Sequence, residues 1–341
     1  MSELEISPVD PSDDAAIDAW HAVYLAAERH GREEVATSWA LEELRTQLQG
    51  PTRSRRSLLF LGRVAGEAVV GGNVQVRLLD NLTSAEVCVY TAPGRRRQGH
   101  GSAMHALVEE TARAEGRTLL TSETPWAHDL GPTGAGAPGL EFARAHGYDL
   151  GIADVMRVLR LPVADALLED LAARAAPHHT AYTLRSWVGP VPDDLVQSWA
   201  ELTTTLMTEA PLGGMEREPE AVDIAALREG EDLGRRQGRT KVNTVALDAE
   251  GAVVAYTDIA VTVHEPTRAY QWGTLVRRAD RGHRLGMAVK VANLALLQRE
   301  TQGLGTLVTW NAEVNDHMIG VNEQLGFEAV ERLGELQKRL D

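Results

Sequence analysis

The sequence predicts an α/β (α+β) protein in which one domain occurs twice, in tandem. Two observations carry this prediction: an internal repeat, and the same order of strand-like and helix-like apolar runs in both copies. The chain has 341 residues, which is enough for two domains of ordinary size. Hydrophobic residues make up 43% and charged residues 24%, the balance of a soluble globular protein.

The repeat is clearest around two glycine-rich segments. "GEAVVGGNV" begins at Gly66, and "GAVVAYTDI" begins at Gly251, 185 positions later. The same offset aligns "RRQGHGSAM", from Arg96, with "RGHRLGMAV", from Arg281. An earlier echo, "PSDDAAIDAW" and "VPDDLVQSWA", has nearly the same spacing. Two pairs of similar segments, in the same order and at nearly the same spacing, indicate a duplication.

The elements of each copy can be justified in chain order. A first helix starts at an aspartate cap, Asp14 or Asp194. Two apolar runs joined by a tight turn, such as "VNTVALDAEGAVVAYTDIAVTV", then predict a β-hairpin. A third strand, "AEVCVYTA" or "AYQWGTLV", leads into a loop of arginine and glycine.

The loop is followed in each copy by a helix, predicted over 102–115 and 287–299, since its apolar residues fall at helical spacing. Another strand follows, "RTLLTSE" or "GTLVTWNA". A second helix then ends in "AHGY" or "QLGF", where glycine fits the position after a helix C-terminus.

The segment "RLPVADALLEDLAARAAPHHTAYTL" separates the two copies. Its first part predicts a helix that Pro177 ends. We therefore expect an N-terminal domain over 1–162, a linker over 163–180 and a C-terminal domain over 181–341.

The charge and the cysteine content exclude several classes of protein. The formal net charge of −15 opposes a global nucleic-acid binder, which would be basic. The single cysteine, Cys88, can form neither an internal disulfide nor a cysteine-based zinc site, and we expect no metal. An acidic N-terminus and the lack of any 18-residue apolar run predict a cytoplasmic protein with no membrane partner.

The loop "RRRQGHG" between strand and helix predicts an anion site. Gly99 and Gly101 carry no side chain, so an anion can approach the backbone N–H groups closely. The following helix adds its positive N-terminal dipole, and Arg95, Arg96 and Arg97 can add charge-assisted contacts. These features suit a pyrophosphate.

Other interpretations of the loop fit the sequence less well. A Walker loop would end in Gly-Lys-Ser/Thr, and a dinucleotide fingerprint would have glycine or alanine at Met104. One small cluster of arginines on so acidic a chain is a poor match for a DNA backbone. A solvated arginine loop with turn glycines stays open, but recurrence of the loop in the second copy opposes it.

Strand, Arg/Gln-x-x-Gly-x-Gly/Ala and helix, placed after a β-hairpin, resemble the acyl-CoA-binding motif of the GNAT N-acetyltransferases. The duplication resembles a tandem GNAT of the mycothiol synthase type. The resemblance implies two domains, each a mixed, mostly antiparallel twisted sheet flanked by helices. It also implies acetyl-CoA as cosubstrate and transfer of the acetyl group to a primary amine of a small molecule by direct attack.

The resemblance implies that both loops and the strand ends before them contact the cofactor. The implied residues are Thr91, Arg96, Arg97, Gln98, Gly99, His100, Gly101 and Ser102 in the first copy, and Val276, Arg281, Gly282, His283, Arg284, Leu285, Gly286 and Met287 in the second. Arg284 stands where the motif has its first glycine. Asn311 and Asn315 match positions of cofactor-contacting asparagine in the family, although Asn315 also fits a helix N-cap.

The family commonly has a tyrosine, four residues before the glycine of "GF" or "GY", that protonates the leaving thiolate. Ala143 and Asn322 occupy this position, so neither copy has the tyrosine. A thiol pKa of about 8.5 makes thiolate a tolerable leaving group, and Asn322 could hydrogen-bond the sulfur. The base candidates are Glu209, Asp258 and Glu313 in the second copy, and Glu86 and Glu123 in the first.

We expect the second copy to be catalytic and the first to be a structural or CoA-holding copy. The alternative is a catalytically degenerate tandem GNAT that acts as an acyl-CoA-binding or regulatory module. The sequence leaves open whether the acceptor is an antibiotic, a metabolite or a peptide. We expect no nucleic-acid partner, and a monomer or a homodimer.

Overall fold

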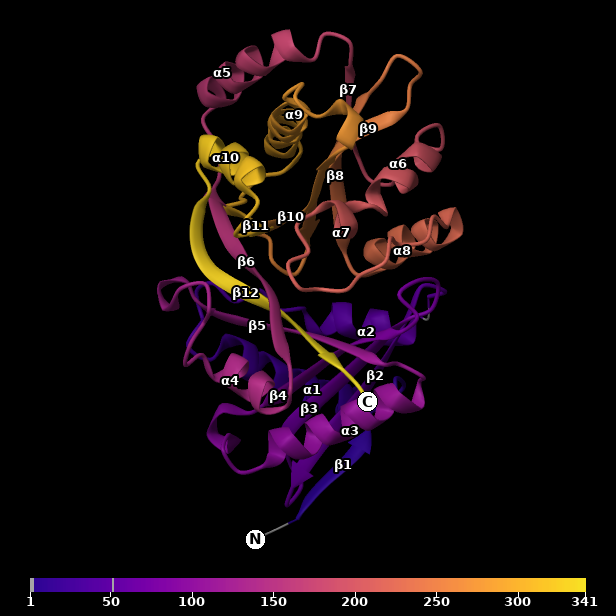
Figure 1. Ribbon diagram of the computed structural model, residues 1–341, viewed down its shortest axis with the longest axis vertical. Helices are drawn as coiled ribbons and strands as arrows, with labels where there is room; N and C mark the ends of the chain where they lie inside the picture. The colour runs from indigo at the N-terminus through magenta and orange to yellow at the C-terminus, as the bar shows by residue number, and fades with distance from the viewer. Residues whose placement is uncertain (1–2, 51) are drawn as a thin grey trace. The chain divides into compact units, whose positions relative to one another are not determined.

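The computed structural model describes residues 3–50 and 52–341 and divides into two compact units (Figure 1). Unit 1 consists of the chain up to Pro125 together with Ala135–Gly151 and Gly334–Asp341, and unit 2 consists of Trp126–Gly134 and Ile152–Leu333. The expected linker, 163–180, therefore lies inside unit 2. The end of the chain lies in unit 1, because the last strand begins in one unit and ends in the other.

Unit 1 is built on a mostly antiparallel sheet. Neighbouring strands pair in the order β1-β2-β3-β4-β5, and only β4 and β5 are parallel. The elements that start in this unit are β1 (Leu4–Pro8), α1 (Asp14–Arg29), α2 (Leu41–Gln49), β2 (Arg55–Val64), β3 (Glu67–Arg77), β4 (Ser84–Thr91), the 3-10 helix η1 (Pro93–Arg95), α3 (His100–Ala114), β5 (Leu119–Ala127), α4 (Pro138–Ala145) and β6 (Asp149–Arg160).

Two adjacent glycines let helices approach both faces of this sheet. A Cβ on Gly71 would lie 2.9 Å from Nε1 of Trp20 in α1, and a Cβ on Gly72 would lie 2.6 Å from Sδ of Met104 in α3. Because successive strand residues point to opposite faces, α1 and α3 cover opposite faces of β3.

Unit 2 repeats this plan. Its strands pair in the order β7-β8-β9-β10-β11-β6, antiparallel except for β10 and β11. Its elements are η2 (His128–Leu130), α5 (Asp165–Ala175), η3 (Ala176–His178), β7 (Thr183–Val188), α6 (Val196–Thr203), α7 (Leu206–Glu209), α8 (Ile224–Arg236), β8 (Arg239–Leu247), β9 (Val253–Thr262), β10 (Arg268–Val276), η4 (Arg278–Asp280), α9 (Leu285–Glu300), β11 (Thr306–Ala312), α10 (Asp316–Leu325) and the first part of β12 (Glu328–Arg339).

Helix α9 forms the centre of unit 2 and is apolar on nearly all sides. It packs on β8 and β9, and α5 covers another of its sides (Figure 1). Leu171 and Ala175 of α5 belong to the same buried cluster as Met287 and Val291 of α9. A helix enclosed in this way needs no polar face.

The fold class and the helices after the two loops are confirmed. The predicted helix over 287–299 runs from Leu285 to Glu300, and the interdomain helix ends at Ala175, before Pro177. The predicted caps were wrong. Asp13, and not Asp14, accepts from the N–H of Ala16. Asp194 caps no helix because its carboxylate is bound by Arg185, and α6 starts at Val196.

The end of β12 is held by unit 1. Lys338 Nζ lies 2.5 Å from Oε2 of Glu109 on α3, and the N–H of Leu340 donates to the carbonyl of Thr118 across 2.8 Å. The chain terminus is therefore an integral part of the first unit.

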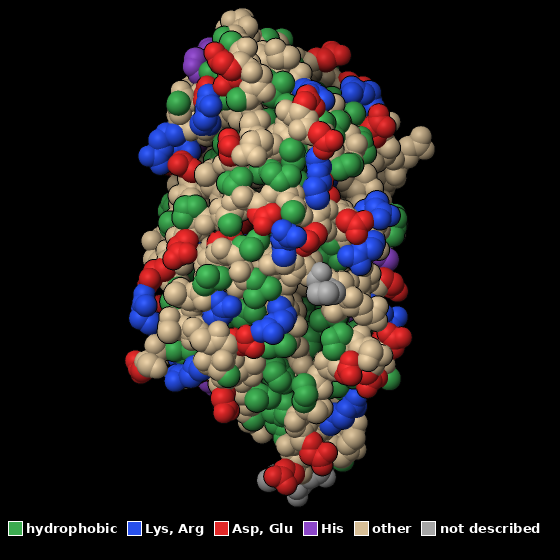
Figure 2. Space-filling model, turned by 90° about the vertical axis from the view of Figure 1, so that its right-hand side faces the viewer, with side chains coloured by type: hydrophobic (Ala, Val, Ile, Leu, Met, Phe, Trp, Pro, Cys, Tyr) green, Lys and Arg blue, Asp and Glu red, His purple; other side chains and the backbone are tan. Residues whose placement is uncertain are grey.

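The charged residues of the surface are mixed. Acidic and basic side chains are interspersed over the face shown in Figure 2. Many of them form ion pairs between helical neighbours, such as Arg113 with Glu109 and Arg235 with Asp232. Within the described part of the chain, no helix has both the length and the apolar character needed to cross a bilayer.

Candidate functional site

The two arginine–glycine loops have the same backbone conformation. Arg96 and Arg281 both have φ −68° and ψ 159°. Nε of Arg96 donates to the carbonyl of Thr91 across 3.4 Å, and Nε of Arg281 donates to the carbonyl of Val276 across 3.2 Å. The offset of 185 residues seen in the sequence therefore holds for individual hydrogen bonds.

Each loop has two residues in the left-handed region. The first copy has arginine and then glycine at these two positions, and the second copy has glycine and then arginine. The first loop has Arg97 at φ 63° and Gly99 at φ 87°, whereas the second has Gly282 at φ 88° and Arg284 at φ 51°. Arg284 thus adopts the conformation of the glycine it replaces. The cost is about 1 kcal/mol for a side chain in this region.

The predicted cofactor residues occupy equivalent places in the two units. Thr91 and Val276 end their strands, and the loops run on from them into the first turns of α3 and α9. Gly101 and Ser102 lie in the first turn of α3, as Gly286 and Met287 lie in that of α9. Gln98 and His283 lie in the loops, His100 is the first residue of α3, and the buried Leu285 is the first residue of α9.

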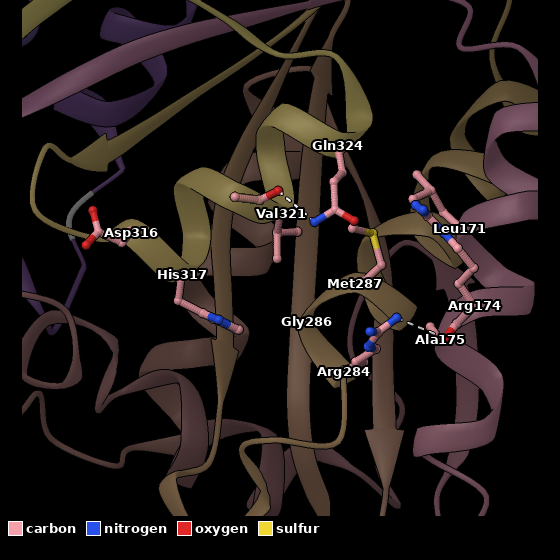
Figure 3. A pocket seen from close by; sticks show the side chains of 11 residues that line it. Leu171, Arg174, Ala175, Arg284, Gly286, Met287, Asp316, His317, Val321 and Gln324 are labelled. Carbon is pink, nitrogen blue, oxygen red and sulfur yellow. Dashed lines mark hydrogen bonds between the residues drawn. The ribbon is translucent and has the colours of Figure 1, made fainter.

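A pocket of about 310 Å³ lies against the second loop (Figure 3). Its lining comes from the N-terminal turn of α9, from α10 and from α5. The lining residues are Leu171, Arg174, Ala175, Arg284, Gly286, Met287, Asp316, His317, Gly320, Val321 and Gln324.

Aromatic rings occupy the equivalent place beside the first loop. A Cβ on Gly101 would lie 3.3 Å from the ring of Phe142 on α4, whereas a Cβ on Gly286 would meet nothing closer than 3.9 Å. The rings of Phe142 and His146 are 4.2 Å apart, and those of His146 and His105 are 4.5 Å apart. Burial and the neighbouring His146 lower the pKa of His105 to about 4, so the imidazole of His105 is uncharged at neutral pH.

The strands before and after each loop separate from each other. β10 and β11 pair only over Arg268–Tyr270 and Thr306–Val308, although both strands continue. β4 and β5 likewise pair only over Ser84–Glu86 and Leu119–Thr121. Beyond these points the facing edges are free of strand-to-strand bonds, a geometry that an extended ligand can enter.

Only the second copy has a bulge in the strand before the loop. The pairing of β10 with β9 shifts between Gln271 and Gly273, which makes Trp272 the extra residue. β4 pairs with β3 without a shift from Ala85 to Thr91. A bulge leaves the backbone of its extra residue outside the ladder, so the N–H of Trp272 is a candidate donor to a ligand.

The arginines of the second loop have internal partners. Oε2 of Glu209 lies 2.8 Å from Nη2 of Arg281 and 3.3 Å from Nη2 of Arg278. The side chains of these arginines are 45% and 77% exposed, so each pair stabilises the fold by only about 0 to 1 kcal/mol. A diphosphate could replace the carboxylate. Glu209, predicted as a base, thus lies beside the loop as its counter-ion.

Glu313, the second predicted base, is bound by Arg332. Nη2 of Arg332 lies 2.6 Å from Oε1 of Glu313, and this hydrogen bond lowers the pKa of Glu313. A carboxylate with a lowered pKa is a weaker base. Asp258 is buried, with Nζ of Lys241 at 2.7 Å and the N–H of Gly273 at 2.9 Å.

The asparagines of the second copy form a buried pair. Nδ2 of Asn322, a residue with no exposed surface, donates to Oδ1 of Asn311 across 2.5 Å. Oδ1 of Asn322 is buried without a hydrogen-bond partner. Asn315 caps α10, where its Oδ1 accepts from the N–H of Met318 across 3.2 Å.

Lys290 is a buried cation that the sequence analysis did not select. It is 1% exposed, it donates to Oε1 of Gln271, and it lies over the ring of Phe327. Burial lowers the pKa of Lys290 to about 7. The signal in the sequence was a single lysine in the apolar run "LGMAVKVANLALL".

The donors near the pocket suit a phosphorylated ligand. Backbone N–H groups at the start of α9, the guanidinium of Arg284 and the space beside Gly286 fit a diphosphate. In residues 3–50 and 52–341, no cluster of three or more His, Cys, Asp or Glu side chains is arranged to hold a metal ion.

Comparison with known proteins identifies the fold. No family model and no curated protein matches the chain. A tandem GNAT protein from the clavulanic acid biosynthesis pathway is 28% identical, with a TM-score of 0.78 over 99% of this chain and 98% of that one. A GCN5-related N-acetyltransferase from Sphaerobacter thermophilus is 15% identical, with a TM-score of 0.66 over 98% and 95%.

A third similar structure is a glucosamine N-acetyltransferase region of a fungal multi-domain β-N-acetylglucosaminidase. It is 15% identical with a TM-score of 0.64, and the match covers 98% of this chain and 38% of that one. The likeness to the tandem GNAT protein extends over both copies and both loops. The chain therefore has the fold of the GNAT acetyltransferases in its tandem form.

Proposed function

We propose that the protein is an acyl-CoA-dependent N-acyltransferase that transfers acetyl from acetyl-CoA to a primary amine of a small molecule by direct attack. The pocket at the N-terminal turn of α9 carries this proposal. Its volume of about 310 Å³ lies at the lower end of the range of about 300–1,000 Å³ for small-molecule sites. The family makes acetyl-CoA the natural donor.

The second copy supplies the binding groups in this proposal. The N–H groups of Gly282 to Met287 and the guanidinium groups of Arg281 and Arg284 would hold the diphosphate. The edges of β10 and β11 beyond their last paired residues would hold the pantetheine arm, near Asn311. In the first copy, Phe142 fills the matching space, which supports a structural role for that copy.

The bulge gives the carbonyl oxygen of the thioester a donor. Charge develops on this oxygen during attack, and a fixed N–H stabilises it. We assign this role to Trp272, the extra residue of the bulge.

A base must remove a proton from the acceptor, because a free alkyl amine has a pKa of about 10. We propose Glu209 for this role and Glu313 as the weaker candidate, since Arg332 lowers the pKa of Glu313. A diphosphate that takes over Arg278 and Arg281 would leave the carboxylate of Glu209 without these two partners and available to the acceptor amine.

One observation favours a second candidate function, an acyl-CoA-binding module without turnover. Asn322 lies at the position of the family's general acid, and its amide is engaged with Asn311. An amide cannot supply a titratable proton. An enzyme built this way would have to release CoA as thiolate.

The experiment that separates the two functions measures thiol release from acetyl-CoA with a panel of small primary amines, together with calorimetric titration of CoA. We expect CoA to bind and at least one amine to give turnover that Arg281→Glu abolishes. Binding of CoA without turnover from pH 7 to pH 9 would select the binding module. Failure to bind CoA would contradict both functions.

A further inference from the structure

The third wall of the pocket comes from α5, which lies outside the duplicated elements. Leu168, Leu171 and Ala175 of α5 are buried in the core cluster that contains Met287 and Val291 of α9. This packing fixes α5 against the helix whose N-terminus faces the pocket. The position of the wall is therefore set by the core of unit 2.

Arg174 is the cation of this wall. Its side chain lines the pocket and is 51% exposed (Figure 3). Nη1 of Arg284 donates to the carbonyl of Arg174 across 3.1 Å, which ties the loop to α5 and brings the two arginines to one side of the pocket. An ion pair joins Nε of Arg174 to Oδ2 of Asp170 across 3.2 Å, on the exposed surface of α5.

We propose that Arg174 binds the 3′-phosphate of coenzyme A and so makes the second copy selective for the 3′-phosphorylated nucleotide. This inference rests on the proposed function. A diphosphate on the loop would occupy the N-terminus of α9 and the guanidinium of Arg281, which leaves Arg174 as a further cation on a separate wall. A phosphate monoester carries a charge of about −1.5 to −2 at pH 7 and matches the planar donors of a guanidinium.

The test compares CoA with 3′-dephospho-CoA by calorimetric titration of the full chain. Charge-assisted hydrogen bonds of this kind change affinity by about tenfold or more. We expect wild-type protein to bind CoA about tenfold more tightly than dephospho-CoA. Arg174→Gln should remove this preference by weakening CoA about tenfold, while the affinity for dephospho-CoA stays the same.

Two further variants sharpen the test. Asp170→Asn removes the carboxylate that competes for Arg174, so it should strengthen CoA binding about two- to fivefold without changing dephospho-CoA binding. Arg299→Gln, a matched exposed arginine in the last turn of α9, should change neither affinity.

The outcomes are distinct. Equal loss of both ligands in Arg174→Gln, as expected for stacking of the guanidinium on adenine, would overturn the proposal. So would unchanged affinity for CoA in that variant. If the wild-type protein binds neither nucleotide, the proposed function itself fails, and that result differs from all the others.

Discussion

Oε2 of Glu209 lies 2.8 Å from Nη2 of Arg281, so a candidate base occupies the guanidinium that a diphosphate would need. The carboxylate and the diphosphate therefore compete for one cation. The competition is weak because the pair is exposed, and it links cofactor binding to the availability of the candidate base.

The first prediction concerns this pair. Glu209→Gln removes the competing carboxylate, so we expect CoA to bind about two- to fivefold more tightly while kcat falls by about 10²-fold or more. Calorimetry and steady-state kinetics would measure the two effects. Glu201→Gln on the exposed surface of α6 is the control. Weaker CoA binding in Glu209→Gln would contradict the competition.

The second prediction compares the two loops. Arg281→Glu should weaken CoA binding at least tenfold, since it reverses a charge at the loop beside the pocket. Arg96→Glu should change the affinity less than about threefold, because Phe142 fills the space beside the first loop. Calorimetry on both variants gives the answer. Equal losses would count against a single cofactor-binding copy.

The third prediction concerns acid stability. The pKa of His105 is about 4 in the folded protein and about 6.5 when unfolded, so the unfolded state binds more protons in between. Stability is therefore lost as the pH falls from about 6.5 to 4, and at pH 5 the loss from this group is about 2 kcal/mol.

Urea denaturation of the wild-type protein and of His105→Asn at pH 7.5 and pH 5 measures how much stability each protein loses between these pH values. The variant should lose less stability between the two pH values than the wild type. His178→Asn, an exposed histidine, is the control and should behave as the wild type. An identical pH dependence for His105→Asn would show that His105 does not carry the effect.

The fourth prediction concerns Lys290. Its pKa is about 7 in the folded protein and about 10.4 when unfolded, so the unfolded state again binds more protons. The free energy of unfolding should therefore rise by about 2 kcal/mol between pH 7 and pH 9 from this group alone. Lys290→Met should abolish the rise, and denaturation at the two pH values measures it. A rise of the same size in the variant would assign it to other groups.

The parts of the fold set by local pattern could be predicted. Glycine spacing located both loops, and the long apolar run after the second loop located α9 to within two residues at its start. The repeat gave the equivalence of Arg96 and Arg281, because a duplicated sequence keeps its backbone conformation. Asn315 was interpreted either as a cofactor contact or as a helix N-cap, and the structure shows it as the cap of α10.

The parts set by distant contacts could not be predicted. No local pattern shows that Phe142 fills the first site or that α5 completes the second, since both depend on which helices pack together. The ion pair of Glu313 with Arg332 joins β12 to the end of β11, and it changed Glu313 from a good to a weak candidate base. Burial of Lys290 likewise follows from distant contacts, with Gln271 of β10 and with the ring of Phe327.

The division of β12 between the units has a consequence for biosynthesis. A ribosome completes the duplicated elements of the first copy long before it adds Gly334–Asp341, yet unit 1 includes these residues and binds them through Glu109 and Thr118. Unit 1 therefore stays incomplete until Gly334–Asp341 have been translated. A protein truncated after β11 would lose residues of both units at once. The two units therefore depend on the same C-terminal segment to complete their folds.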